Sequence, residues 1–161
     1  MSEASGPPES EKDEERLTDT LQALDHASRF AEVAGEKDGL ASAPGGSEDQ
    51  RATDLCAEAM RHAVSIAGEV GVLPQRRDQV ARVVALSSSG SPTEKAVVDL
   101  ERCARTLHEL QPAHRKVTLG SVAGGALSAD EAFARVERVR RLEALAHHAW
   151  RSAAHLVGSP A

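Results

Sequence analysis

Two pairs of side chains in this sequence have a spacing that could serve metal chemistry. Glu58 and His62 are four residues apart, and so are Glu143 and His147. Residues at i and i+4 share one side of a helix, so each pair places a carboxylate beside an imidazole, as a metal site in a bundle requires. Di-iron carboxylate proteins instead use Glu-x-x-His with further inward glutamates, and no Cys/His spacing suggests zinc. We interpret both pairs as ion pairs on helix flanks, and we expect no metal and no cofactor.

A second candidate is a line of histidines near the C-terminus. His148 and His155 are seven residues apart with Ser152 between them, so they lie on one side of a helix. Imidazoles in such a line could bind phosphate or respond to pH, because their charge changes near neutrality. Polar surface is the simpler interpretation, and the sequence leaves the role of this line open.

Basic residues form a third candidate, for contact with nucleic acid. Clustered arginines are the electrostatic footprint of phosphate binding. The chain is acidic overall and has only three aromatic residues, which argues against this role. We interpret the basic residues as a solvated face paired with Glu137 and the acidic N-terminal half. Nucleic-acid contact remains the alternative, and its candidate residues are Arg115, Lys116, Arg135, Arg138 and Arg141.

The stretch "LQPAHRKVTLGSVAGGALSADEAFARV" (110–136) resembles the start of the helix-turn-helix in region 4 of sigma factors. There a proline-led basic helix, a glycine turn and a capped helix precede a recognition helix. "ALSADEAF" (126–133) is similar to the final part of ANTAR domains, which are RNA-binding antiterminator modules. Both resemblances imply a helical segment that reads nucleic acid. The chain departs from the first because "ERVRRLEALAHHAWRSAAHLV" runs on without a second turn, and from the second because "TLGSVAGG" replaces an Ala-Lys-Gly element.

The elements that must position these residues are all predicted to be helices. Capping boxes, in which a serine and a Glu or Gln three residues later satisfy free amides, predict helix starts at Ser47, Ser91 and Ser128. Pro74 predicts a further, shorter helix to about Leu86. We expect the helix after Ser91 to end near Pro112, and one short helix to end at Gly124. The three aromatic residues are Phe30, Phe133 and Trp150, and the last two fall on the predicted buried stripe of the final helix.

The N-terminal third is predicted to differ from the rest. Residues 1–11 form a disordered tail because they have too little apolar surface to order, and residues 35–48 form a Gly/Pro/Ser linker. Between them, residues 12–34 form an amphipathic helix whose narrow stripe, Leu17, Leu21, Leu24 and Ala31, needs something to lie against. Residues 49–158 form the helical bundle domain. We therefore expect an all-α bundle of four main helices, preceded by an acidic tail and one extra amphipathic helix.

Composition and charge narrow the function. Residues 1–73 carry 6 basic and 16 acidic side chains, whereas residues 74–161 carry 13 and 9. Hydrophobic residues make up 40% of the chain, but many are alanines, so the core must be lean and a partner would add to it. Cys56 and Cys103 fall on apolar stripes, where thiols behave as small hydrophobes.

No secretory signal, membrane-spanning run, phosphate loop or nucleophile elbow is recognisable, and tyrosine is absent. We therefore expect a cytoplasmic, reduced, non-enzymatic protein that does not enter membranes. Its function is predicted to be interaction or regulation, through a protein partner or a second copy of itself. The alternative is a nucleic-acid-associated regulator that uses the basic C-terminal half.

Overall fold

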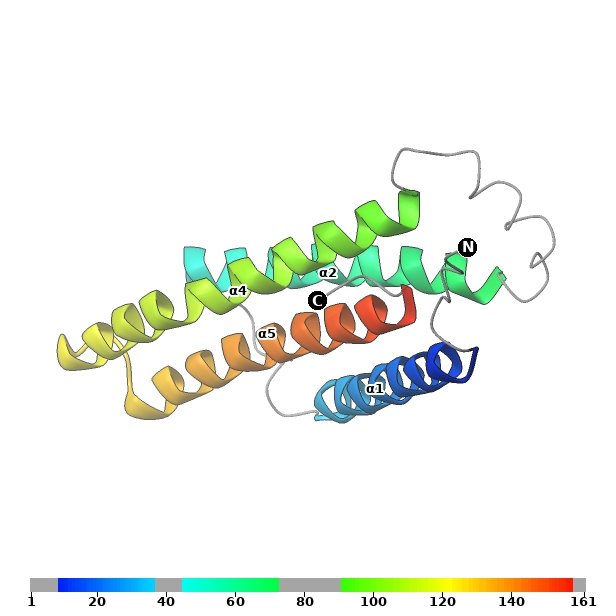
Figure 1. Cartoon of the computed structure of the whole chain (residues 1–161). Helices are drawn as coiled ribbons and strands as arrows, with labels where there is room; N and C mark the ends of the chain where they lie inside the picture. The colour runs from blue at the N-terminus through cyan, green and yellow to red at the C-terminus, as the bar shows by residue number, and fades with distance from the viewer. Residues whose placement is uncertain (1–8, 37–44, 73–90, 158–161) are drawn as a thin grey trace, which may run out of the picture.

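A computed structural model describes residues 9–36, 45–72 and 91–157, which form four α-helices and no strand (Figure 1). The all-α class is confirmed for these residues. The helices are α1 (Glu9–Gly35), α2 (Ser47–Val72), α4 (Pro92–Ala123) and α5 (Ala129–Val157). Helix α1 begins inside the segment predicted as a tail. Residues 1–8, most of the predicted linker and the predicted helix after Pro74 lie outside the described residues.

The four helices do not contribute equally to the core. Helices α2, α4 and α5 pack against one another, whereas α1 packs along α5 and along no other described helix (Figure 1). Small side chains allow the close approach of the three mutually packed helices, since Ala52, Ala59 and Ala146 are fully buried. The largest fully buried side chains are Leu100, Leu107, Val139 and Cys103. The predicted lean core is thus an alanine-rich interface between three helices, with α1 added at its edge.

Both cysteines belong to this core. Cys56 on α2 and Cys103 on α4 are free thiols, and their exposed fractions are 4% and 1%. Burial, and to a smaller extent the neighbouring Cys103 thiol, raises the pKa of Cys56 to about 11. Cys56 is therefore a neutral, apolar core residue at physiological pH.

Two of the three predicted capping boxes are confirmed. The Ser91 hydroxyl accepts the Glu94 amide, and the Glu94 carboxylate accepts the Ser91 amide. Ser128 and Glu131 make the same reciprocal pair at the start of α5.

The predicted capping box of Ser47 and Gln50 is wrong, because the side chain that turns back is that of Asp49, one residue earlier than Gln50. The Gln50 amide group donates to Asp54 instead of turning back to Ser47, and the Gln50 backbone amide donates to the Gly46 carbonyl. The side chain that turns back is Asp49, whose carboxylate accepts the Gly45 amide at 3.0 Å. Asp49 was not recognised because a Ser-x-x-Gln pattern occupies the same stretch.

The predicted end of a helix at Pro112 is also wrong, because α4 continues through it to Ala123. Proline removes one helix hydrogen bond, and here the tertiary contacts of the following turns outweigh that loss. His114 and Thr118 are buried, and the Thr118 hydroxyl donates to the His114 carbonyl at 2.8 Å. Residues 108–123 are therefore the second half of one long helix, and not the separate first helix that the sigma-factor resemblance implies.

The turn between α4 and α5 ends α4 close to the predicted position. Gly125 has φ of 74°, and the amides of Gly125 and Ala126 donate to the carbonyls of Val122 and Ser121. This is the Schellman pattern, which requires a residue in the left-handed region and so favours glycine. The turn returns the chain antiparallel, so α4 and α5 form a long hairpin (Figure 1).

The buried face of α5 is rotated relative to the predicted stripe. Ala132 lies inward, so its neighbour Phe133 is 72% exposed, and the prediction that Phe133 is a core residue is wrong. Trp150 is half-buried at the margin of the core, where it stacks edge-on against His147 and lies beneath the Arg151 guanidinium. Its placement inside the bundle is therefore only partly correct.

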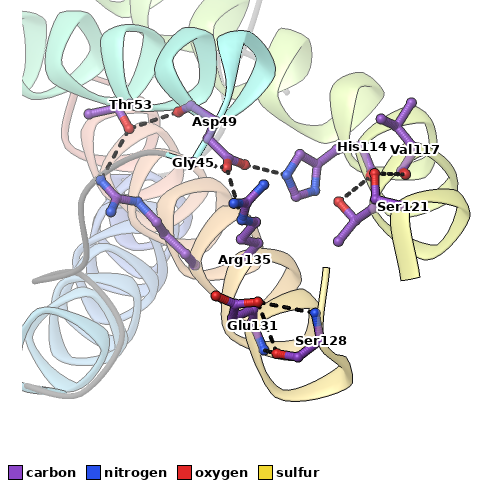
Figure 2. A network of polar contacts seen from close by, with 11 residues as sticks. Gly45, Asp49, Thr53, His114, Val117, Ser121, Ser128, Glu131 and Arg135 are labelled. Carbon is purple, nitrogen blue, oxygen red and sulfur yellow. Dashed lines mark hydrogen bonds and ion pairs between the residues drawn. The ribbon is translucent and has the colours of Figure 1, made fainter. Parts of the chain in front are cut away.

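A buried polar network joins α2, α4 and α5 at the end of the bundle where α2 begins (Figure 2). The Asp49 carboxylate is 3% exposed and accepts a hydrogen bond from the His114 imidazole, which is 4% exposed. The Arg135 guanidinium lies 4.0 Å from the same carboxylate. Asp49, in the first turn of α2, thus contacts the second half of α4 and the first turns of α5.

We expect Asp49→Ala to lower the free energy of unfolding by about 3–5 kcal/mol, because it leaves the buried His114 imidazole without its acceptor and removes the carboxylate beside the partly exposed Arg135 guanidinium. The matched control is Asp54→Ala, since Asp54 is exposed on the same helix and should cost less than about 0.5 kcal/mol. Urea unfolding followed by circular dichroism measures both. Equal effects of the two substitutions would show that the network does not stabilise the fold.

Candidate functional site

The apolar stripe of α1 faces solvent. Leu17, Leu21 and Leu24 are 60%, 58% and 61% exposed, although leucines at this spacing normally mark the buried side of a helix. Ser28 and Ala31 continue the same line and are also exposed. The positions 17, 21, 24, 28 and 31 alternate steps of four and three residues, which is the spacing of a coiled-coil seam. We call these five residues the α1 seam.

Acidic residues surround the α1 seam. Helix α1 contains eight acidic and three basic side chains, and five of the acidic ones precede Leu17. Asp25 flanks the seam and is paired with Arg29 at 3.0 Å on the exposed surface. The seam is therefore an apolar line with an acidic N-terminal end.

The opposite face of α1 packs on α5 through small and polar side chains. Ala23 is 2% exposed, and its carbonyl accepts a hydrogen bond of 2.9 Å from the Ser152 hydroxyl. The His155 imidazole donates to the Asp19 carboxylate at 3.2 Å. Phe30 is the one aromatic side chain of α1 that packs against the core. The leucine spacing of α1 predicts the opposite side of the helix as the docked one.

Four imidazoles meet at this contact, and we call them the histidine cluster: His26 of α1 with His147, His148 and His155 of α5. His26 and His148 approach with their Nδ1 atoms 3.1 Å apart, so one of these nitrogens must donate to the other. His26 stacks on His155 at a centroid distance of 5.9 Å, and His147 lies edge-on to His148 at 5.3 Å. The predicted His148/His155 line is thus a contact face for α1.

Protonation of two members of the cluster, His26 and His148, is disfavoured. Burial, together with the facing His148 and Arg151, lowers the pKa of His26 below its usual value of 6.5. Burial and the adjacent His147 likewise lower the pKa of His148, while Glu143 and Asp25 act weakly in the opposite direction. The docked arrangement therefore favours the uncharged forms of His26 and His148.

The five basic residues proposed for nucleic-acid contact do not share one exposed face. Arg115 and Lys116 are exposed on the second half of α4. Arg135 lies beside Asp49, and Arg141 is held by Glu36 and Glu137 at 3.1 and 3.3 Å. Arg138 is only 7% exposed, and one of its nitrogens donates to the Thr53 hydroxyl at 3.3 Å. Three of the five therefore have partners within the chain.

Arg115 and Lys116 line a cleft between α4 and α5, together with Arg140 of α5. The cleft has a volume of about 460 Å³ and is also lined by Leu119, which is 57% exposed. Arg140 is already bonded to Glu137, at 2.9 Å through its Nε atom. This cleft is an accessible basic surface that could receive an anionic ligand.

The two Glu/His pairs behave differently. Glu58 lies 3.7 Å from His62, which fits the predicted ion pair. Glu143 instead lies 3.5 Å from His108 of α4, while His147 packs in the histidine cluster. The predicted pairing of Glu143 with His147 is therefore replaced by a contact between helices, which spacing along one helix does not reveal.

Comparison with known proteins gave no match: no family model, no curated sequence and no solved structure is significantly similar to this chain. Among the described helices, none has a stretch long and apolar enough to cross a membrane.

We expect the contact between α1 and α5 to weaken in mild acid. Because the pKa values of His26 and His148 are lowered in the docked state, the separated helices bind more protons as pH falls through about 6.5. Stability contributed by the contact is therefore full above neutrality and is lost below it. Urea midpoints at about pH 7.5 and about pH 5.5 should differ more for the native chain than for His26→Gln/His148→Gln.

That comparison separates the cluster from other acid-sensitive groups, since the Asp49–His114 contact is present in both proteins. An identical loss of stability in the native chain and the double variant would exclude the histidine cluster as its cause.

Proposed function

We propose that this chain is a non-enzymatic interaction protein that associates through the α1 seam, and that the first partner is a second copy of the chain. The observation that carries the proposal is the exposure of Leu17, Leu21 and Leu24 on one side of α1, about 60% each. An exposed apolar line at coiled-coil spacing is characteristic of a surface that another helix covers. In this view α1 is the extra amphipathic helix, attached to the three mutually packed helices by a mixed face that contains Ala23, Phe30 and Val33 beside polar groups.

The energy available at the α1 seam supports a moderate affinity. Full burial of a leucine side chain contributes roughly 1.5–3 kcal/mol, so covering the exposed 60% of each contributes about 1–2 kcal/mol. Six leucines from two copies then supply on the order of 6–11 kcal/mol, against an association cost of about 4–15 kcal/mol. The most favourable difference between these ranges is about 7 kcal/mol, so a dimer held by the seam alone should have a dissociation constant of about 10 μM or weaker and dissociate on dilution.

Charge favours an antiparallel pair. In a parallel pair the acidic N-terminal turns of both α1 helices would lie side by side and repel each other. In an antiparallel pair each acidic end lies beside the C-terminal part of the other helix, which is less acidic because it carries Asp25 and Glu32 against Arg29. Leu21 and Leu24 then face each other across the two-fold axis, and Leu17 faces the smaller Ser28 of the partner. This arrangement is isologous and closes at two copies.

We expect Leu21→Ser/Leu24→Ser to abolish self-association without unfolding the chain, because both side chains are exposed in the monomer. The native chain should show a concentration-dependent increase in mass, towards twice that of the monomer, in analytical ultracentrifugation over roughly the micromolar range. The double variant should remain monomeric throughout. Val64→Ser/Val98→Ser is the matched control, since these side chains are 72% and 62% exposed on α2 and α4 and should leave the dimer intact.

Two outcomes would contradict self-association through the seam. One is a native chain that stays monomeric up to about millimolar concentration, since no dimer would then form. The other is an association that the valine control abolishes and the leucine variant does not, which would assign the contact to α2 and α4.

The alternative function is contact with nucleic acid through the cleft between α4 and α5. The observation that favours it is the meeting of Arg115, Lys116 and Arg140 at one apolar-floored groove. Against it, Arg135, Arg138 and Arg141 are held by partners within the chain. We therefore assign any such contact to Arg115 and Lys116, and we regard it as non-specific.

We expect the full chain to bind duplex DNA or RNA no more tightly than about 10⁻⁶ M at physiological salt, which is the non-specific range. Fluorescence anisotropy with labelled oligonucleotides measures this affinity. Arg115→Gln/Lys116→Gln should weaken it further, and Arg51→Gln/Arg61→Gln, which removes two exposed charges from α2, should have a smaller effect. Submicromolar, sequence-selective binding that depends on Arg115 and Lys116 would make nucleic-acid recognition the principal function.

A further inference from the structure

Three possible metal ligands meet where α2 packs on α4. Glu58 and His62 lie on α2, and Cys103 lies on α4. The carboxylate oxygen, imidazole nitrogen and thiol sulfur of these residues all lie within 4.8 Å of one another. It is the one such cluster found among the described residues.

The position of the cluster follows from the packing of the two helices. Cys103 is 1% exposed and belongs to the core, whereas the side chains of Glu58 and His62 are 40% and 25% exposed at its margin. The sulfur therefore approaches the Glu/His pair from the inside, while the outer side remains open to solvent. Sequence spacing identifies only the pair on α2, because Cys103 is 41 residues beyond His62 and joins it through tertiary packing.

We propose that Glu58, His62 and Cys103 form a binding site for a single zinc ion. A thiolate, an imidazole and a carboxylate are the three ligand types that Zn²⁺ takes in proteins, and three protein ligands leave a fourth position for water. The mixed sulfur, nitrogen and oxygen set excludes Mg²⁺ and Ca²⁺, which prefer oxygen ligands alone. This site is separate from the α1 seam, and the proposal does not rest on self-association.

The distances require only small movements. Bonds of about 2.0–2.3 Å in a tetrahedral site place ligand atoms roughly 3.3–3.8 Å apart. The His62 nitrogen and the Glu58 oxygen are already 3.7 Å apart. The long side chain of Glu58 is at the surface and can adjust, while the buried Cys103 sulfur provides the fixed point.

Binding of zinc would replace two existing interactions of the ligand residues: the Arg102–Glu58 ion pair and the sulfur–hydrogen bond of Cys103. The Arg102 guanidinium lies 3.5 Å from Glu58 and 3.2 Å from Asp99, so it keeps Asp99 as a partner when zinc takes Glu58. The Arg102–Glu58 contact is exposed, and contacts of this kind contribute little to stability. The Cys103 thiol loses its proton to solvent as the sulfur–zinc bond forms, so one proton is released for each ion bound.

Cobalt titration of the full chain under reducing conditions tests the site, because Co²⁺ substitutes for Zn²⁺ and is coloured. We expect a near-ultraviolet thiolate-to-cobalt charge-transfer band together with the visible bands of a tetrahedral ion, and loss of both when Zn²⁺ is added. Cys103→Ser should remove the charge-transfer band. His62→Gln and Glu58→Gln should each weaken binding by about tenfold or more.

Two controls isolate this site from other ligands of the chain. Cys56→Ser removes the other core thiol and should leave the charge-transfer band intact. His26→Gln/His148→Gln disrupts the histidine cluster, which contains no sulfur, and should also leave the band intact. Because Cys103 is buried, the folding of Cys103→Ser is checked by circular dichroism. If that variant does not fold, the two variants at the surface decide the question.

Three results would overturn the proposal. The first is the absence of a charge-transfer band in the native chain. The second is a band that Cys56→Ser removes and Cys103→Ser retains. The third is cobalt binding that His62→Gln and Glu58→Gln leave unchanged, since the thiol would then bind the ion without its two expected neighbours.

Discussion

The contact between Asp49 and His114 is the constraint on which the described bundle depends. It is almost completely buried, and it joins the first turn of α2 to the part of α4 that follows Pro112. A buried carboxylate needs donors, and here the imidazole, the Gly45 amide and the nearby Arg135 guanidinium supply them. This contact explains why α4 continues through Pro112. The helix has to extend beyond the proline for His114 to reach Asp49.

Helix α1 is attached in a different way from the three mutually packed helices. Helix α1 is joined to α5 by hydrogen bonds and stacked imidazoles and leaves its leucines in solvent. A surface helix normally buries its apolar stripe, because that burial is what stabilises a helix of marginal propensity. Helix α1 instead docks through a mixed face, with Ala23, Phe30 and Val33 among the polar contacts, and leaves its leucine line uncovered. The zinc site proposed between α2 and α4 would stabilise the three-helix core without involving α1.

The sequence predicted the parts of this structure that depend on neighbouring residues. Helix starts at Ser91 and Ser128 were recognised because a capping box is complete within four residues. The end of a helix at Gly124 was also predicted from neighbouring residues, because two adjacent glycines are a local signal for a turn. Contacts between distant residues were not predicted. Asp49 and His114 are 65 residues apart, and His26 and His148 are 122 apart, so only the assembled fold brings either pair together.

The errors have the same origin. Periodicity identified a leucine stripe on α1 correctly but could not tell which side of the helix would be docked. The spacing of Phe133 fits Val136 and Val139 and so predicts a core position, whereas the structure buries its neighbour Ala132 instead. Pro112 normally predicts the end of a helix, and it does not do so here because the buried contact of His114 with Asp49 and the burial of Thr118 hold the following turns.

Because α1 packs on α5, it cannot dock until α5 has been synthesised. The partner of His26 is made 122 residues later, so at about 5–20 residues per second α1 waits on the order of 6–24 seconds for its docking surface. Throughout that time both sides of the helix are open to solvent, including the leucines. The first described helix to leave the ribosome is thus the last to find its place within its own chain, and a neighbouring nascent copy can meet it first.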